Sequence, residues 1–94
     1  MRVTEADCEY AYFYEFSDGN ICQLSINLEL WDKKPRVIEI PKTLRKNGKT
    51  YKVTEFNIWR GYYGREHKVI VRYPHGVSHP DIHIDNYVTD EVWD

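Results

Sequence analysis

Apolar and polar side chains alternate strictly along the segment from Cys22 to Leu30. Successive side chains of a β-strand point to opposite faces, so a period of two predicts a strand with one buried face, here over residues 21–31. We expect Leu24, Ile26 and Leu28 to lie in the core. The complete apolar side is Cys22, Leu24, Ile26, Leu28 and Leu30, and the polar side is Gln23, Ser25, Asn27 and Glu29.

A preceding strand is predicted over residues 9–16, and the sequence SDGN between the two strands is typical of a hairpin turn. The length of the turn decides which residues face each other. A two-residue Asp18-Gly19 turn would place Tyr14 opposite the polar Gln23. A three-residue loop of residues 17–19, with Gly19 left-handed, instead places Tyr14 opposite Cys22, and this is the register that we expect.

In that register the aromatic side of the first strand packs on the apolar side of the second. The tyrosines of the first strand then form a half-buried face on Leu24 and Ile26 rather than a ligand-binding surface. Cys8 lies opposite Leu28 and away from Cys22, so we expect two reduced cysteines, which are also too few for a disulfide scaffold. The tyrosines concerned are Tyr10, Tyr12 and Tyr14.

The remaining predicted strands are short. They cover residues 36–40, a hairpin with Asn47-Gly48 at its turn and residues 50–56 as its second arm, residues 68–74, and residues 82–88. An aromatic content of 15% and the scarcity of alanine also favour strands over helices. We therefore expect one all-β domain of mainly antiparallel hairpins, with little or no helix. Its parts are an N-terminal hairpin (1–31), a repeat-like region (36–77) and an acidic tail (78–94).

Two similar segments, VIEIP and VIVRYP, flank the run Asn-Gly-Lys-Thr-Tyr-Lys-Val-Thr at residues 47–54. The order of Ile40-Pro41, this run and Val71-Arg72-Tyr73-Pro74 resembles the BspA-type leucine-rich repeats of bacterial and protist surface proteins, over about residues 36–77. The chain departs from their pattern at Ile58-Trp59, where Ala-Phe is usual, and at Tyr73, where isoleucine is usual. The resemblance implies a minimal, single-repeat-like unit that is non-catalytic and binds proteins or surfaces.

Repeats of this kind normally stack, because one repeat cannot bury its own face and about three or more are needed with caps. This chain holds at most about one and a half repeats. Either the chain is a stand-alone relative of these repeats whose N-terminal hairpin closes one end of the core, or it shares their sequence pattern without forming a solenoid.

Charge is segregated along the chain, with a net charge of −5 over residues 1–31, +8 over residues 32–73 and −5 over residues 74–94. Either the acidic ends fold onto the basic centre, or the centre presents a basic face to an anionic partner such as nucleic acid. The acidic ends also suggest a small inhibitor or immunity-type protein that blocks a basic groove. The acids that would act in this way are Glu5, Asp7, Glu9, Asp90, Glu91 and Asp94.

A run of histidines and aspartates near the C-terminus is a candidate metal site. Asp81, His83 and Asp85 would share one face of a strand with His79 nearby, which could hold a metal, but a solvated edge strand has the same pattern, and we expect no metal site here. The sequence holds no nucleophile elbow, phosphate loop, dinucleotide fingerprint or Cys-x-x-Cys pair. We therefore expect a protein that is not an enzyme and carries no cofactor.

The sequence IWRGYYGRE concentrates the residue types that dominate protein-binding hot spots and that also stack on single-stranded nucleic acid. Two glycines let this segment bend as a loop. The alternative is that the tryptophan and one tyrosine fill the core. We expect a protein-binding site here, with nucleic acid as its rival. Its residues are Trp59, Arg60, Tyr62, Tyr63 and Arg65.

No apolar run approaches the roughly 20 residues that span a membrane, and the first ten residues, MRVTEADCEY, lack the apolar stretch of a signal peptide. We therefore expect a cytoplasmic protein that does not enter the membrane. A cell-surface or secreted protein is the alternative, if the chain is a fragment whose signal peptide was removed.

Overall fold

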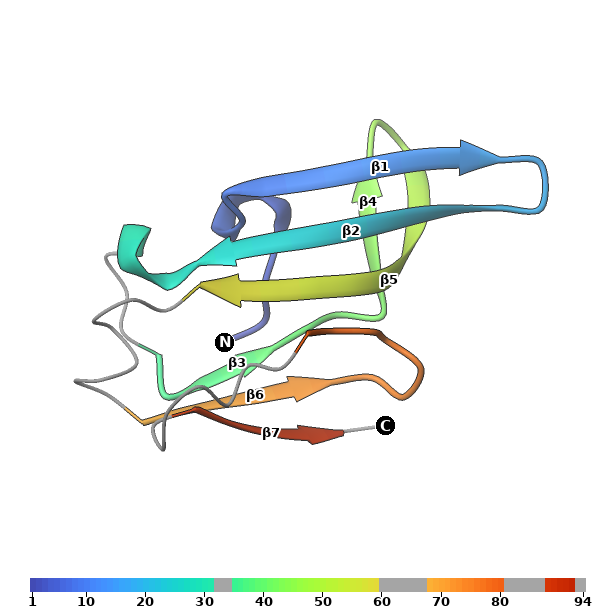
Figure 1. Ribbon diagram of the computed structural model, residues 1–94. Coiled ribbons are helices and arrows are strands. Elements are labelled where there is room, and N and C mark those ends of the chain that lie inside the picture. The colour runs from blue at the N-terminus through green and yellow to red at the C-terminus, as the bar shows by residue number, and fades with distance from the viewer. Residues whose placement is uncertain (32–34, 60–67, 81–87, 93–94) are drawn as a thin grey trace.

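The computed structural model describes residues 1–31, 35–59, 68–80 and 88–92. These residues form strands and two 3-10 turns without any α-helix, which confirms the expected all-β class (Figure 1). The strands are β1 (Tyr10–Phe16), β2 (Gly19–Asn27), β3 (Val37–Glu39), β4 (Thr43–Lys46), β5 (Lys49–Trp59), β6 (Val69–Tyr73) and β7 (Val88–Val92), and the 3-10 turns are η1 (Glu5–Asp7) and η2 (Leu28–Leu30).

The strands form two sheets, a large sheet in the order β1-β2-β5-β4 and a small sheet in the order β3-β6-β7. The hairpins β1–β2 and β4–β5 are antiparallel, as expected. The pairs β2–β5, β3–β6 and β6–β7 are parallel, so antiparallel hairpins account for only part of the fold. Parallel neighbours cannot be joined by a tight turn and need a crossover connection, which here runs through the other sheet.

The chain winds between the two sheets in a solenoid-like manner. From β2 it passes to β3, returns at β5, passes to β6, touches β5 again at Ser78 and ends in β7. The Phe56 N–H donates to the Ser78 carbonyl (3.0 Å) and the Ser78 N–H to the Thr54 carbonyl (2.9 Å). In consequence the similar segments VIEIP and VIVRYP lie side by side, with Ile38 opposite Val71.

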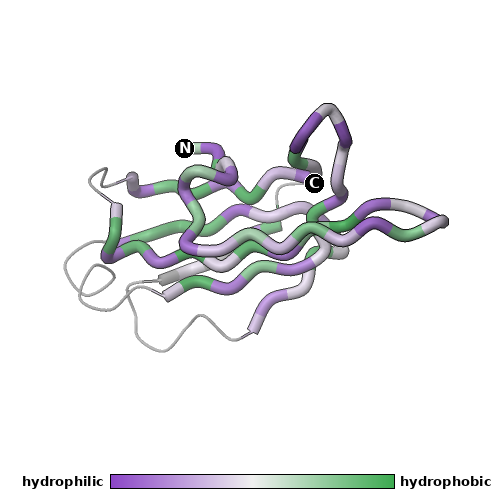
Figure 2. The backbone as a smooth tube through the Cα atoms, turned by 90° about the horizontal axis from the view of Figure 1, so that it is seen from above, coloured by the Kyte–Doolittle hydropathy of each residue, from purple (hydrophilic) through white to green (hydrophobic). Residues whose placement is uncertain are grey.

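One hydrophobic core lies between the inward sides of both sheets. Figure 2 shows how apolar (green) and polar (purple) residues are distributed along the backbone. Leu24, Ile26 and Leu28 are buried, as predicted. Leu30, the last residue of the predicted apolar side, is 65% exposed and lies beyond the end of the strand. The strand ends at Asn27, whose side chain accepts a hydrogen bond from the Glu29 N–H (3.1 Å). The 3-10 turn η2 begins at the next residue, and this change of backbone conformation interrupts the period of two.

Strand β5 carries an irregularity at Thr54. Cys22 pairs with Val53 but Gln23 pairs with Glu55, so Thr54 is an extra residue on β5. A bulge of this kind shifts the side-chain alternation by one position. The buried residues are therefore Tyr51 and Val53 before the bulge and Phe56 after it, which explains why the alternation over residues 50–56 is imperfect in the sequence.

The β1–β2 hairpin differs from the register expected from the sequence. Its turn has two residues, Ser17 and Asp18, and Gly19 pairs with Phe16. Gly19 has a positive φ of 147°, but as the first residue of β2 rather than as a loop position. Tyr14 consequently lies opposite Ile21, one position from the expected Cys22, and this slip turns the whole aromatic side of β1 to the other face.

The C-terminal region contributes a strand instead of a tail alone. β7 pairs in parallel with β6 along its length, from Val69 opposite Val88 to Tyr73 opposite Val92. Most of the strand predicted over residues 82–88 lies outside the described residues.

Candidate protein-binding surface

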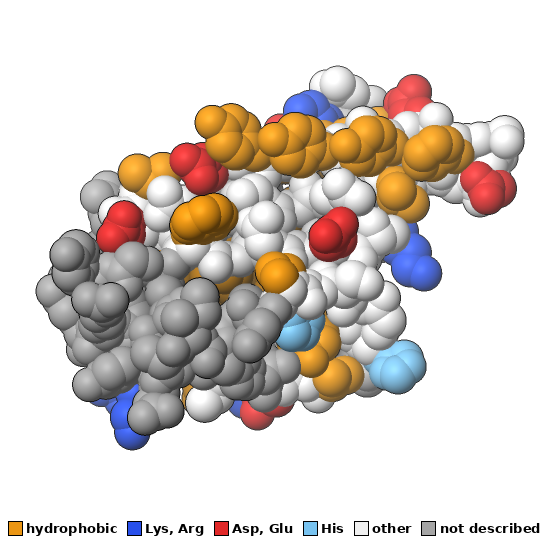
Figure 3. Space-filling model, in the orientation of Figure 1, with side chains coloured by type: hydrophobic (Ala, Val, Ile, Leu, Met, Phe, Trp, Pro, Cys, Tyr) orange, Lys and Arg blue, Asp and Glu red, His pale blue; other side chains and the backbone are white. Residues whose placement is uncertain are grey.

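Four exposed aromatic side chains form a row along β1, on the face of the large sheet that points away from the core. Figure 3 shows them as a continuous line of hydrophobic side chains along β1. Neighbouring rings are 6.2 Å apart between Tyr10 and Tyr12 and 6.4 Å apart between Tyr14 and Phe16. We call this set the aromatic row: Tyr10 (57% exposed), Tyr12 (49%), Tyr14 (41%) and Phe16 (54%).

This exposure corrects the expectation of a half-buried tyrosine face packed on Leu24 and Ile26. In the observed register Tyr12 lies opposite Gln23, on the polar side of β2. The side of β1 that points inward instead carries Ala11, Phe13 and Glu15. Sequence reasoning missed the row because it matched the more aromatic side of β1 to the apolar side of β2, whereas the two-residue turn sets the opposite match.

The β4–β5 hairpin anchors the inward side of β1. The Phe13 ring packs edge-on against Tyr51, with their centroids 4.9 Å apart, and the Lys46 ammonium lies 4.5 Å from the Phe13 centroid. Such a pairing of rings and cation stabilises the contact beyond simple burial. The Lys46 Nζ also forms a salt bridge with Glu5 (2.7 Å), which ties η1 to the same hairpin.

Glu15, the single charged residue of β1, is also held by this hairpin. Its Oε1 accepts hydrogen bonds from Lys49 Nζ (2.6 Å) and Tyr51 Oη (2.9 Å). The hydrogen bond from Lys49, then that from Tyr51, holds the pKa of Glu15 below its usual value, and the same contacts raise the pKa of Lys49 and of Tyr51. β1 is therefore fixed in place, so the aromatic row stands on a supported strand.

A groove of about 550 Å³ runs beside β1, between the strand and the tip of the β4–β5 hairpin. It is lined by β1 from Ala11 to Glu15 and by Lys46, Asn47 and Tyr51. β1 is the terminal strand of the large sheet, and the described residues place no strand beyond it.

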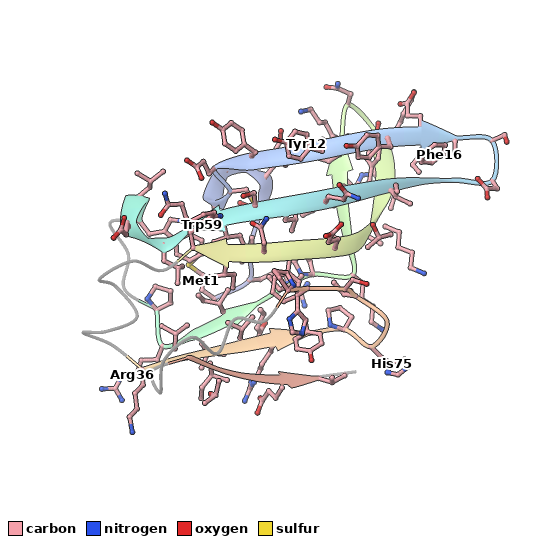
Figure 4. All side chains as sticks on the ribbon, viewed as in Figure 1. Met1, Tyr12, Phe16, Arg36, Trp59 and His75 are labelled. Carbon is pink, nitrogen blue, oxygen red and sulfur yellow. The ribbon has the colours of Figure 1, made fainter. Side chains whose placement is uncertain are left out.

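Trp59 ends β5 on the same outward face as the aromatic row. It lies opposite Asn27 and is 66% exposed, so it does not fill the core (Figure 4). Figure 4 shows Tyr12 and Phe16 on β1 and Trp59 two strands away on β5. The other residues predicted for the binding site, Arg60, Tyr62, Tyr63 and Arg65, lie outside the described residues.

The histidine–aspartate run is described only at His79. Its ring packs against Tyr73, with centroids 4.7 Å apart, and against Phe56 at 5.1 Å, so it forms part of an aromatic cluster. Asp81, His83 and Asp85 lie outside the described residues, and the part of the chain that is described contains no group of three metal-ligating side chains.

The two cysteines are free thiols, as expected. Burial, followed by the nearby charge of Asp7, raises the pKa of Cys8 to about 12. Burial raises the pKa of Cys22 to about 11. Both thiols are therefore protonated at neutral pH and are poor nucleophiles.

Several acids from the chain ends pair with bases of the centre. Lys46 binds Glu5 and Lys49 binds Glu15 from the N-terminal part, and Arg72 binds Glu91 from β7. The Arg72 Nη1 atom also lies 3.9 Å from the Glu39 Oε1 atom. For these residues the segregated charges meet within the molecule, which is the first of the two arrangements considered from the sequence.

No family model, curated protein or solved structure matches this chain. Among the residues that the structure describes, no helix combines the length and apolar character needed to cross a membrane.

Proposed function

We propose that this protein is a non-catalytic protein–protein interaction module that binds its partner through the aromatic row and Trp59. The carrying observation is that four aromatic side chains of one strand are each 41–57% exposed on one sheet face. Burying rings of this size is strongly favourable, and Tyr and Trp lose little conformational entropy on binding. Contiguous exposed apolar patches typically mark interaction sites in proteins.

The support beneath the row favours binding over incidental exposure. Phe13, Lys46 and Glu15 join β1 to the β4–β5 hairpin, so the rings are presented by a strand that is held from behind. A pre-organised surface pays less entropy on association than a mobile one. The solenoid-like winding and the resemblance to BspA-type repeats add weight to a binding role.

An inhibitor or immunity-type protein is one form that this function could take, and the rings would then carry its binding energy. Several of the acids first considered for that role have contacts inside the chain. Glu5 pairs with Lys46, and Asp7 accepts hydrogen bonds from the Thr4 N–H (2.9 Å) and hydroxyl (3.0 Å). Acids engaged in this way would have to give up these contacts before they could bind a partner's bases.

Binding of nucleic acid by the basic centre (residues 32–73) is the second candidate. Lys46, Lys49 and Arg72 of this centre are each paired with an acid, which lowers the positive potential available to phosphates. Binding that depends on phosphate contacts weakens steeply as salt rises. Tight, salt-sensitive binding of single-stranded DNA or RNA at about 50 mM salt would favour this candidate over ours.

Site-specific photocrosslinking tests the proposal. A benzophenone side chain replaces Tyr14 in the row or, as the control, the exposed Thr89 of the small sheet, and lysate of the source organism is irradiated with each protein. We expect a discrete crosslinked protein from position 14 and none of the same mass from position 89. Equal crosslinking from both positions would contradict the proposal.

Truncation of the rings then measures their contribution with the identified partner. Tyr12→Ala and Trp59→Ala should each weaken binding by roughly thirtyfold, the effect of losing about 2 kcal/mol at a hot spot. Because both side chains are about half exposed or more, the melting temperature should stay nearly unchanged. Thr89→Ala is the matched control and should bind like the wild type.

A further inference from the structure

The free edge of β1 lacks, in its own sequence and register, the features that normally prevent strands from pairing between molecules. Proteins protect edge strands with lysine, proline, bulges or a covering segment. β1 has seven residues, YAYFYEF, with no lysine and no proline. Its register with β2 is continuous from Tyr10 to Phe16, and its one charge, Glu15, is already paired with Lys49. The edge is therefore continuous and mostly apolar, and its one charge is paired.

The turn determines which backbone groups point outward from this edge. In a two-residue hairpin the residues that flank the turn, here Phe16 and Gly19, form a hydrogen-bonded pair, and such pairs alternate along the ladder. The N–H and C=O groups of Ala11, Phe13 and Glu15 consequently point away from β2. The groove of about 550 Å³ lies beside these same residues and leaves room along the edge.

The sequence of β1 is complementary to itself when two copies run antiparallel about Phe13. Tyr12 then faces Tyr14 of the second copy, and Tyr10 faces its Phe16. On the other side Ala11 faces Glu15, so no two like charges are opposed and the small alanine leaves space for the carboxylate. This register also places the outward backbone groups of positions 11, 13 and 15 opposite those of positions 15, 13 and 11, and it pairs all seven residues.

We propose that β1 pairs antiparallel with β1 of a second copy of this chain, about a two-fold axis at Phe13. The interface is self-complementary, as two-fold dimers require. It joins the two large sheets edge to edge and sets the two aromatic rows side by side on one face. Aromatic cross-strand pairs of this kind stabilise the ladder. The proposal rests on the proposed function in one respect, since it names the dimer as the unit that presents the binding surface.

A charge-swap experiment tests both the edge and the register. Sedimentation velocity of the full chain over about a hundredfold range of concentration should show a monomer–dimer equilibrium. The double variant Tyr12→Lys/Tyr14→Lys places lysine opposite lysine twice, and Tyr12→Glu/Tyr14→Glu places glutamate opposite glutamate. Each should weaken its own dimer by at least about tenfold, because like charges directly opposite destabilise a strand pair. An equal mixture of the two should form a heterodimer.

The control is Thr89→Lys, which adds an exposed lysine to the small sheet and should dimerise like the wild type. Both double variants alter exposed side chains, and circular dichroism should confirm that they fold. A wild type that stays monomeric, a lysine double variant that dimerises normally, or a mixture that forms no heterodimer would each overturn the proposal.

The outcomes separate this inference from the proposed function. A monomeric wild type that still crosslinks to another protein from position 14 refutes only the dimer. A dimer whose position 14 crosslinks to nothing but the second copy supports the inference and refutes binding of a different protein by the row.

Discussion

At the scale of single residues, Glu15 shows how one side chain holds in place the strand that carries the aromatic row. It lies in β1, yet its carboxylate is bound by Lys49 and Tyr51 of β5. A carboxylate that accepts two hydrogen bonds, one from an ammonium group, is stabilised in its ionised form. Glu15 therefore links β1 to the hairpin behind it most strongly while it is ionised.

The lowered pKa of Glu15 predicts a pH dependence of stability. The unfolded chain binds the proton at higher pH than the folded chain, so the contribution of Glu15 is present above its ordinary pKa of 4.5 and is lost as the pH falls through the lower folded-state pKa. Glu15→Gln should lower the melting temperature at neutral pH, and its difference from the wild type should shrink below about pH 4.5. Thermal melts across this range check the prediction, with Asp18→Asn at the hairpin turn as a charge control. A difference that is constant with pH would contradict it.

At the scale of an element, the β4–β5 hairpin depends on its two-residue turn. Asn47 and Gly48 both have left-handed backbone angles, with φ of 53° and 78°. Turns with two left-handed residues match the twist of the strands, and Asn-Gly is the sequence that adopts them at least cost. The turn matters to the surface because this hairpin carries Lys46, Lys49 and Tyr51, which hold β1.

Substitutions at the two turn positions should differ in their effect on stability. Gly48→Ala forces an L-residue into the left-handed region and should lower the free energy of unfolding by about 1–2 kcal/mol. Asn47→Gly removes the same type of cost and should be close to neutral. Urea unfolding of both variants measures the difference. Equal destabilisation by both would show that side-chain contacts, and not backbone conformation, control this turn.

At the scale of the whole molecule, Phe56 connects the large sheet to the small sheet. It lies on β5 of the large sheet and is fully buried. Its ring lies 5.7 Å from the ring of Tyr73 on β6 of the small sheet and 5.1 Å from the ring of His79, measured between centroids. Its backbone N–H also binds Ser78. The bulge at Thr54 is what turns this side chain inward.

Removal of the Phe56 ring should therefore affect the entire fold. Phe56→Ala is expected to cost about 3–5 kcal/mol, which is a large share of the roughly 5–15 kcal/mol that stabilises a domain. Phe16→Ala is the matched control, since Phe16 is 54% exposed in the aromatic row and should change stability little. Chemical denaturation of both variants provides the comparison. A small effect at Phe56 would mean that the two sheets do not share one core.

The sequence alone determined the elements that depend on local patterns. The alternation from Cys22 onward identified a strand with Leu24, Ile26 and Leu28 buried, because the period of two is a property of an extended backbone. The Asn47-Gly48 turn was equally local, since only those residue types adopt its backbone angles cheaply. Trp59 was singled out from residue type, and the structure places it on the surface.

Only the tertiary structure decided which faces and which distant strands meet. The register of the β1–β2 hairpin differs by one residue from the expected register and exposes the aromatic row. A face is buried only if another element covers it, and the covering β4–β5 hairpin begins only at Thr43, far along the chain from β1, which ends at Phe16. The parallel pairs arose for the same reason, because strands such as β3 and β6 meet through a crossover that no local pattern encodes. Residue order fixed the strands, whereas long-range packing fixed their partners and so placed the rings on the surface.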